Sequence, residues 1–150
     1  MSNQNQVGQR SLKSFGYALL ASIESTQLNT AGNAVIVLPM LGGGLTVGNS
    51  VVSSGIVIIR RISLVNPSGA LSTANVSITT SNDGNASNAV VAATALIGLT
   101  GAGTFEDLTI VGGNVVVNGY TTQALYVNVG TASGNNNTVS IRVYGDVVNF

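Results

Sequence analysis

The sequence predicts an all-β fold, an antiparallel β-sandwich or jelly roll of about seven to nine short strands. Three observations predict it: apolar β-branched runs recur along the chain, turns rich in Gly and Asn separate them, and no long helical period is present. β-branched side chains lose rotamer freedom in a helix and pack well on a pleated surface. We expect residues 1–14 to form a flexible N-terminal arm and residues 15–150 a single β-sandwich domain.

The composition indicates a subunit of an assembly. Only 7% of the 150 residues are charged and the net charge is zero, whereas an ordinary soluble domain has about 25% charged residues. Surfaces with so little charge tend to associate. Five basic residues give little electrostatic basis for binding nucleic acid, so we expect no such partner. No apolar run reaches the roughly twenty residues of a membrane-spanning helix, so we expect no membrane partner.

The strongest strand prediction is residues 56–65, a run dominated by Ile and Val. The Asn-Pro-Ser-Gly sequence that follows predicts a turn, in which Pro67 presets φ and Gly69 tolerates positive φ. Residues 71–80 are expected to return as the second strand of a hairpin, because residues 74–79 alternate with period two.

Both faces of the first of these strands carry apolar side chains. In a regular strand the even-numbered residues from 56 to 64 share one side and the odd-numbered residues from 57 to 65 the other. Such a strand is covered on both sides, or its outer face meets another subunit. Arg60 and Arg61 would then point to opposite sides, and at least one would be partly buried beside a carboxylate. The alternative is a β-bulge that turns both arginines to solvent. The available carboxylates are Glu24, Asp83, Glu106, Asp107 and Asp146.

The remaining elements are shorter. Residues 17–23 fit a short helix or a first strand, with the strand favoured, and the Ala-rich residues 89–99 fit a helical turn or an irregular strand. Further strands are predicted at residues 34–38, 45–47, 105–111, 115–117, 124–129 and 138–144. Turns are predicted at residues 29–33, 42–44, 81–85 and 118–119.

The last two predicted strands alternate most cleanly. One side of them is apolar and would face the core, while the other would be a wet or interfacial surface. The apolar side consists of Leu125, Val127, Val129, Val139, Ile141 and Val143, and the other of Tyr126, Asn128, Ser140, Arg142 and Tyr144.

The residues predict no catalytic, cofactor-binding or metal site. The chain has no Cys and no His, which removes the usual zinc ligands and the usual general base. Glu106 and Asp107 are adjacent, so in a strand they point to opposite faces and cannot flank one bond. They are better explained as a solvated strand start or as partners of the arginines. Asp83 lies in an Asn-rich turn without the downstream Glu of a calcium loop.

Four segments resemble small structural proteins of tailed bacteriophages, the head decoration (cement) or minor capsid proteins. They are residues 60–76 (RRISLVNPSGALSTANV), 104–109 (TFEDLT), 124–130 (ALYVNVG) and 144–147 (YGDV). The likeness covers roughly residues 55–150 and includes no catalytic signature. It implies a β-sandwich or jelly-roll subunit, often a trimer, on the outer surface of the capsid. Such a protein is made in the host cytoplasm, binds the major capsid protein and stabilises contacts between capsid subunits.

We place the capsid or oligomer interface at basic and aromatic residues, since Tyr and Arg are enriched at interfaces. The predicted interface residues are Arg10, Lys13, Phe15, Tyr17, Arg60, Arg61, Tyr126, Arg142 and Tyr144. Each has the alternative of an ordinary surface or core position. Two other functions are open: a phage tail or fibre component, and a carbohydrate-binding sandwich. The second ranks below because such modules use exposed aromatics, often Trp, and the chain has no Trp.

Overall fold

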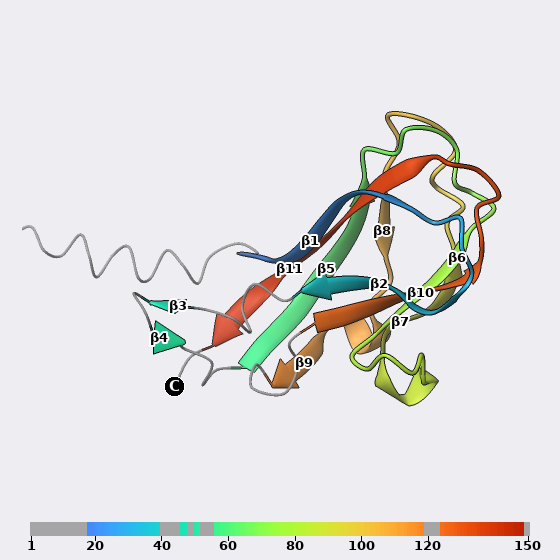
Figure 1. Cartoon of the computed structure of the whole chain (residues 1–150). Coiled ribbons are helices and arrows are strands. Elements are labelled where there is room, and N and C mark those ends of the chain that lie inside the picture. Colours follow the sequence, from blue (N-terminus) through green and yellow to red (C-terminus); the bar gives the residue numbers. More distant parts are fainter. Residues whose placement is uncertain (1–17, 40–45, 48–49, 52–55, 119–123, 149–150) are drawn as a thin grey trace, which may run out of the picture.

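The computed structural model describes residues 18–39, 46–47, 50–51, 56–118 and 124–148. Nine of its strands form two antiparallel sheets, and the buried apolar side chains of both sheets make one continuous core (Figure 1). The predicted all-β sandwich is therefore confirmed, with five strands in one sheet and four in the other. The jelly-roll form of that expectation stays a prediction.

The first sheet is built around a long central strand. Its order is β1-β11-β5-β8, and β9 pairs with β5 beside β8. The strands are β1 (Ala18–Gln27), β5 (Ile56–Val65), β8 (Glu106–Leu108), β9 (Val115–Asn118) and β11 (Thr138–Val148). The region at residues 17–23 that fitted helix or strand is thus a strand from Ala18 onward.

The second sheet covers the inner face of the first. Its order is β2-β10-β6-β7, with β2 (Gly32–Pro39), β6 (Asn75–Thr79), β7 (Ala89–Ala95) and β10 (Ala124–Thr131). The Ala-rich region is therefore an irregular strand, one of the two alternatives, and a 3-10 turn at Ala86–Asn88 leads into it.

A separate two-stranded ladder joins β3 (Thr46–Val47) to β4 (Ser50–Val51). The predicted strand near residues 45–47 therefore forms, but the predicted turn at residues 42–44 lies outside the described residues. The predicted strand at residues 105–111 is shorter than expected: β8 ends at Leu108, and a 3-10 turn follows at Val111–Gly113.

The predicted hairpin between residues 56–65 and 71–80 is wrong. β5 belongs to the first sheet and β6 to the second, so residues 66–74 carry the chain from one sheet to the other. In this connection Asn66 adopts positive φ (54°), and Gly69 does not. The apolar side of each strand is buried equally in a hairpin and in a connection that crosses between sheets. The alternation alone therefore did not distinguish these two arrangements.

Strand β5 contains a bulge at Arg60. Arg61 lies opposite Tyr144 of β11, and Ile59 lies opposite Gly145. One step along β11 therefore matches two steps along β5, and Arg60 is the extra residue. Because side chains alternate in a strand, one extra residue exchanges the two faces of the strand beyond it.

This exchange corrects the prediction of an apolar strand covered on both faces. Val57 and Ile59 point into the core before the bulge, and Ile62 and Leu64 point into the same core after it. Both arginines are exposed, so the alternative of a bulge is confirmed. The core of this one chain thus accounts for Val57, Ile59, Ile62 and Leu64 of the apolar run in β5.

Bulges also interrupt three of the edge strands, β1 in the first sheet and β2 and β7 in the second. Register shifts occur twice in the pairing of β1, once in that of β2 and twice in that of β7. They explain why two consecutive residues are buried in β1 (Leu20 and Ala21) and in β7 (Val90 and Val91). Bulged edge strands are poor templates for pairing with another chain.

The connections at one end of the sandwich are bonded to one another (Figure 1, upper right). The backbone N–H of Leu71 donates to the carbonyl of Leu99 at 2.8 Å, and that of Leu96 to the carbonyl of Ala74 at 3.0 Å. The side-chain amides of Asn135 and Asn137 both donate to the carbonyl of Ala70, each at 3.0 Å. We call residues 28–31, 66–74, 96–105 and 132–137 the loop end.

We predict that Gly145→Ala destabilises the fold strongly. A Cβ there would overlap the carbonyl oxygen of Ile58 and lie 2.9 Å from the carbonyl carbon. Since this obstacle is backbone of the neighbouring strand, we expect a loss of about 3 kcal/mol in the free energy of unfolding. The control is Gly101→Ala, where no atom lies within 4 Å of the new Cβ; it should change stability by less than about 0.5 kcal/mol. Equal stability of the two variants in urea denaturation would contradict the close approach of β11 to β5.

Candidate interaction surfaces

The arginines of the described residues all lie on the outer face of the first sheet, and each pairs with a carboxylate from a neighbouring strand. Arg142 of β11 donates to Glu24 of β1, with 2.6 Å between Nη2 and Oε1. Arg60 of β5 donates through Nε to Asp146 of β11. These two pairs connect the three neighbouring strands β1, β11 and β5 across their outer face.

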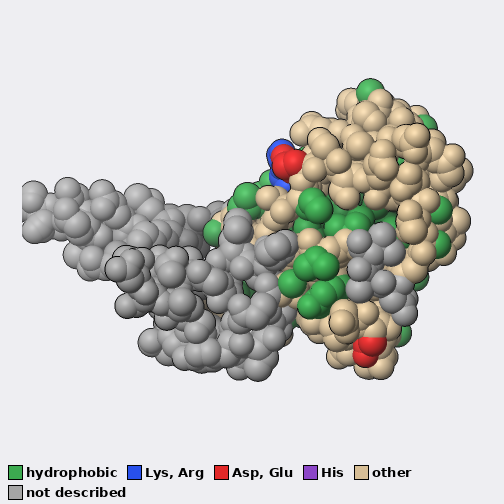
Figure 2. Space-filling model, viewed as in Figure 1, with side chains coloured by type: hydrophobic (Ala, Val, Ile, Leu, Met, Phe, Trp, Pro, Cys, Tyr) green, Lys and Arg blue, Asp and Glu red, His purple; other side chains and the backbone are tan. Residues whose placement is uncertain are grey.

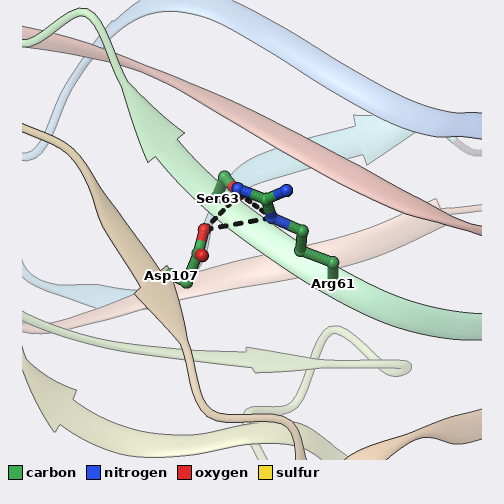
Figure 3. Close-up of polar contacts among 3 residues, drawn as sticks. All are labelled: Arg61, Ser63 and Asp107. Atoms are coloured by element: carbon green, nitrogen blue, oxygen red, sulfur yellow. Dashed lines mark hydrogen bonds and ion pairs between the residues drawn. The ribbon is translucent and has the colours of Figure 1, made fainter. Parts of the chain in front are cut away.

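The third pair joins β5 to β8 (Figure 3). Nε of Arg61 lies 3.2 Å from Oδ1 of Asp107 and 3.0 Å from Oγ of Ser63. The Ser63 hydroxyl donates to the same carboxylate oxygen. Asp107 is thus a partner of an arginine, as one interpretation of the sequence predicted.

These pairs leave the outer face of the first sheet locally neutral. The hydrogen bond from Arg142 holds the pKa of the Glu24 carboxyl below its ordinary value, and Glu24 in turn raises the pKa of Arg142. Exposed ion pairs stabilise a fold by only about 0 to 1 kcal/mol each. Their clearer consequence is that no cation within the described ranges is left without a carboxylate partner.

The second sheet contrasts with the first because its four strands contain no charged residue. Its outer face is polar in part: Asn128 donates to Oγ1 of Thr79 at 3.0 Å, and Thr79 donates to the carbonyl of Ser81 at 2.7 Å. Asn128 is 5% exposed, so the wet alternative of its predicted wet or interfacial surface is wrong. Ser140, predicted on the same kind of surface, is also buried and accepts from the backbone N–H of Ser25.

A hollow of about 280 Å³ lies on the outer side of the second sheet, next to β6 and β7. Small side chains and backbone line it, with no charged residue among them. The lining residues are Ser77, Thr79, Gly84, Ala86, Ser87, Ala89, Ala92, Ala93 and Val111. Nothing in the sequence indicated this hollow. It forms where small side chains from separate segments fail to fill the space between them, and such an arrangement has no sequence motif.

The loop end displays the two most exposed large apolar side chains of the described chain. Ile97 is 74% exposed and Phe105 is 62% exposed. The loop that carries them is fixed from below, because Leu96 and Leu99 are fully buried and the N–H of Gly98 donates to Oε2 of Glu106 at 2.9 Å. Glu106 therefore orders a loop, a role that sequence reasoning did not identify.

The predicted interface residues do not form one surface. Arg60, Arg61, Arg142 and Tyr144 share the outer face of the first sheet, whereas Tyr126 belongs to a strand of the second sheet. The other four, Arg10, Lys13, Phe15 and Tyr17, lie outside the described residues.

The described surface shows few charges in Figure 2: one cluster of basic and acidic side chains and one separate acidic group among mostly neutral atoms. Asp83 accepts from the Ser81 hydroxyl at 2.6 Å and from the N–H of Asn85 at 2.9 Å. These bonds hold the pKa of Asp83 below its ordinary value. Across the described ranges no three His, Cys, Asp or Glu side chains gather where they could hold a metal ion, and no helix there is long and apolar enough to cross a membrane.

No family model matches the chain, and a search of curated proteins found no match to it.

We predict that the fold loses stability in acid and that Glu24 contributes to this loss. A carboxyl whose pKa is lower in the folded chain than in the unfolded one stabilises the fold above its unfolded pKa. That contribution disappears as the pH falls through the folded pKa, which lies below the ordinary value of 4.5 for this carboxyl. Urea denaturation of wild type and Glu24→Gln from neutral pH to pH 2 should show a smaller acid-induced loss for the variant. Parallel curves over this range would contradict the assignment.

Proposed function

We propose that this chain is a structural protein of a tailed-phage virion, a decoration protein that binds the assembled head and stabilises contacts between capsid subunits. It would act as a homo-oligomer, a trimer in the simplest case, on the outer surface of the shell. The phage assignment rests on the resemblance of the four segments given above. The structural role rests on the surface of the folded chain.

One observation carries the structural role: large apolar side chains stand exposed on an ordered, uncharged end of the sandwich, and the arginines of the described residues are each paired with a carboxylate. Exposed apolar patches and low surface charge favour association with other proteins. Arginines already bonded to carboxylates have less capacity to recognise a charged ligand. Both properties favour a partner with an uncharged protein surface.

Stabilisation of a shell follows from preferential binding. A protein that binds neighbouring capsid subunits in the assembled shell, and binds dissociated subunits less well, shifts the equilibrium toward the shell by mass action. The decorating subunit needs no chemistry for this effect. A rigid scaffold and a preformed contact surface are sufficient, because less entropy is lost on binding.

The test uses empty heads of the phage that encodes the chain, stripped of this protein. We expect the purified chain to sediment with heads, to bind dissociated major capsid protein more weakly, and to raise the temperature at which heads come apart. An unrelated sandwich protein of similar size is the control. Absence of binding to heads would contradict the proposal, and density at sixfold tail rings in electron micrographs of virions would support the tail alternative.

A further inference from the structure

We propose that copies of this chain associate head to tail, with Ile97 and Phe105 of one copy seated in the hollow on the second sheet of the next. This contact rests on the self-association that the proposed function includes, and it does not involve binding to a capsid. A chain that fails to self-associate can therefore be distinguished from a chain that fails to bind capsids.

Two kinds of surface are poor candidates for this contact. The outer face of the first sheet carries three ion pairs, and burying paired charges has a desolvation penalty that their attraction often does not repay. The outer strands β1, β2 and β7 carry register shifts, which oppose strand-to-strand pairing between copies. The loop end and the hollow on the second sheet contain no charged residue, so burying them has no such penalty.

The loop end supplies the protruding half of the contact. Ile97 precedes Gly98 in the chain, and Phe105 precedes Glu106. Gly98 and Glu106 are in contact, since a Cβ added to Gly98 would lie 3.5 Å from the Cβ of Glu106. The two exposed side chains therefore start from neighbouring backbone segments. Hydrogen bonds to Ala74 and Leu71 hold this backbone in place before any partner arrives, which reduces the entropy lost on association.

The hollow supplies the receiving half. An apolar cavity of about 150 Å³ holds one benzene molecule, so a hollow of about 280 Å³ has room for a phenyl ring together with an aliphatic side chain. Ala86, Ala89, Ala92, Ala93 and Val111 give it apolar walls. A hollow with largely apolar walls and no charged lining residue suits an apolar protrusion, because the hollow has no hydrated charge to give up.

The two halves lie at different places on the same copy. Neither Ile97 nor Phe105 lines the hollow of its own chain, and the hollow includes Ala89 at the start of β7, whereas Ile97 follows the end of that strand. A contact between unlike surfaces is heterologous: each copy gives its protrusion to one neighbour and its hollow to another. Such contacts produce a closed ring, of which a trimer is one case, or an open chain.

The test separates the two halves with single substitutions at exposed positions. Phe105→Ser removes the protrusion, and Ala92→Glu places a charge in the hollow. By analytical ultracentrifugation over a concentration series, the wild-type chain should exceed the monomer mass, and each variant should dissociate with a Kd raised about ten-fold or more. Ile97→Ser and Ala93→Glu are second variants of each half. Leu19→Ser, an exposed apolar residue of β1, should associate as wild type does.

A mixture of the two defective variants gives the decisive result. Phe105→Ser keeps its hollow and Ala92→Glu keeps its protrusion, so an equimolar mixture should form a one-to-one heterodimer that grows no further. Native mass spectrometry identifies it by its mass. A monomeric wild type, variants that associate like wild type, or a mixture without heterodimer would each overturn the proposal, provided that circular dichroism shows the variants folded.

Discussion

The arrangement of the first sheet depends on the β-bulge at Arg60 of β5. Tyr144 and Gly145 of β11 pair with Arg61 and Ile59, which leaves Arg60 as an extra residue between them. Without the bulge, this ten-residue strand rich in Ile and Val would present apolar side chains to both faces. With it, Val57 and Ile62, which are five positions apart, point into the same core. The central strand can therefore be apolar along most of its length while the sheet keeps a hydrated outer face.

The bulge also decides where the charges lie. It leaves Arg60 and Arg61 side by side on the outside, where carboxylates from two different neighbouring strands pair with them. Among the described strands, the charged residues all belong to the first sheet, and the second sheet and the loop end contain none. This division leaves the uncharged surfaces as the regions where contact with another protein requires least desolvation.

Much of the local structure could be predicted from the sequence. The bounds of β5, the existence of a strand within the predicted residues 71–80 and the inward sides of the last two strands follow from β-branched runs and period-two alternation. Sheet membership could not be predicted in the same way, because alternation says that a strand has a core side without saying which strand it pairs with. The hairpin prediction failed for this reason.

The interaction surfaces were harder to predict than the strands. The roles of Glu106 and Asn128 depend on Gly98 and Thr79, which meet them only after folding. The hollow is a gap between small side chains, and its lining comes from separate parts of the chain. The alternation of β5 fitted both a two-sided strand and a bulged one, so only the register with β11 separates them.

Native-state thiol labelling of single-cysteine variants tests the bulge most directly, because the natural chain has no cysteine. Cysteines at positions 57, 59 and 62 should react slowly, at rates limited by unfolding, and a cysteine at position 61 should react fast. A regular strand would place positions 57, 59 and 61 on one side and position 62 on the other. Equal reactivity at 57 and 61, with a different rate at 62, would contradict the bulge, and so would protection of all four positions.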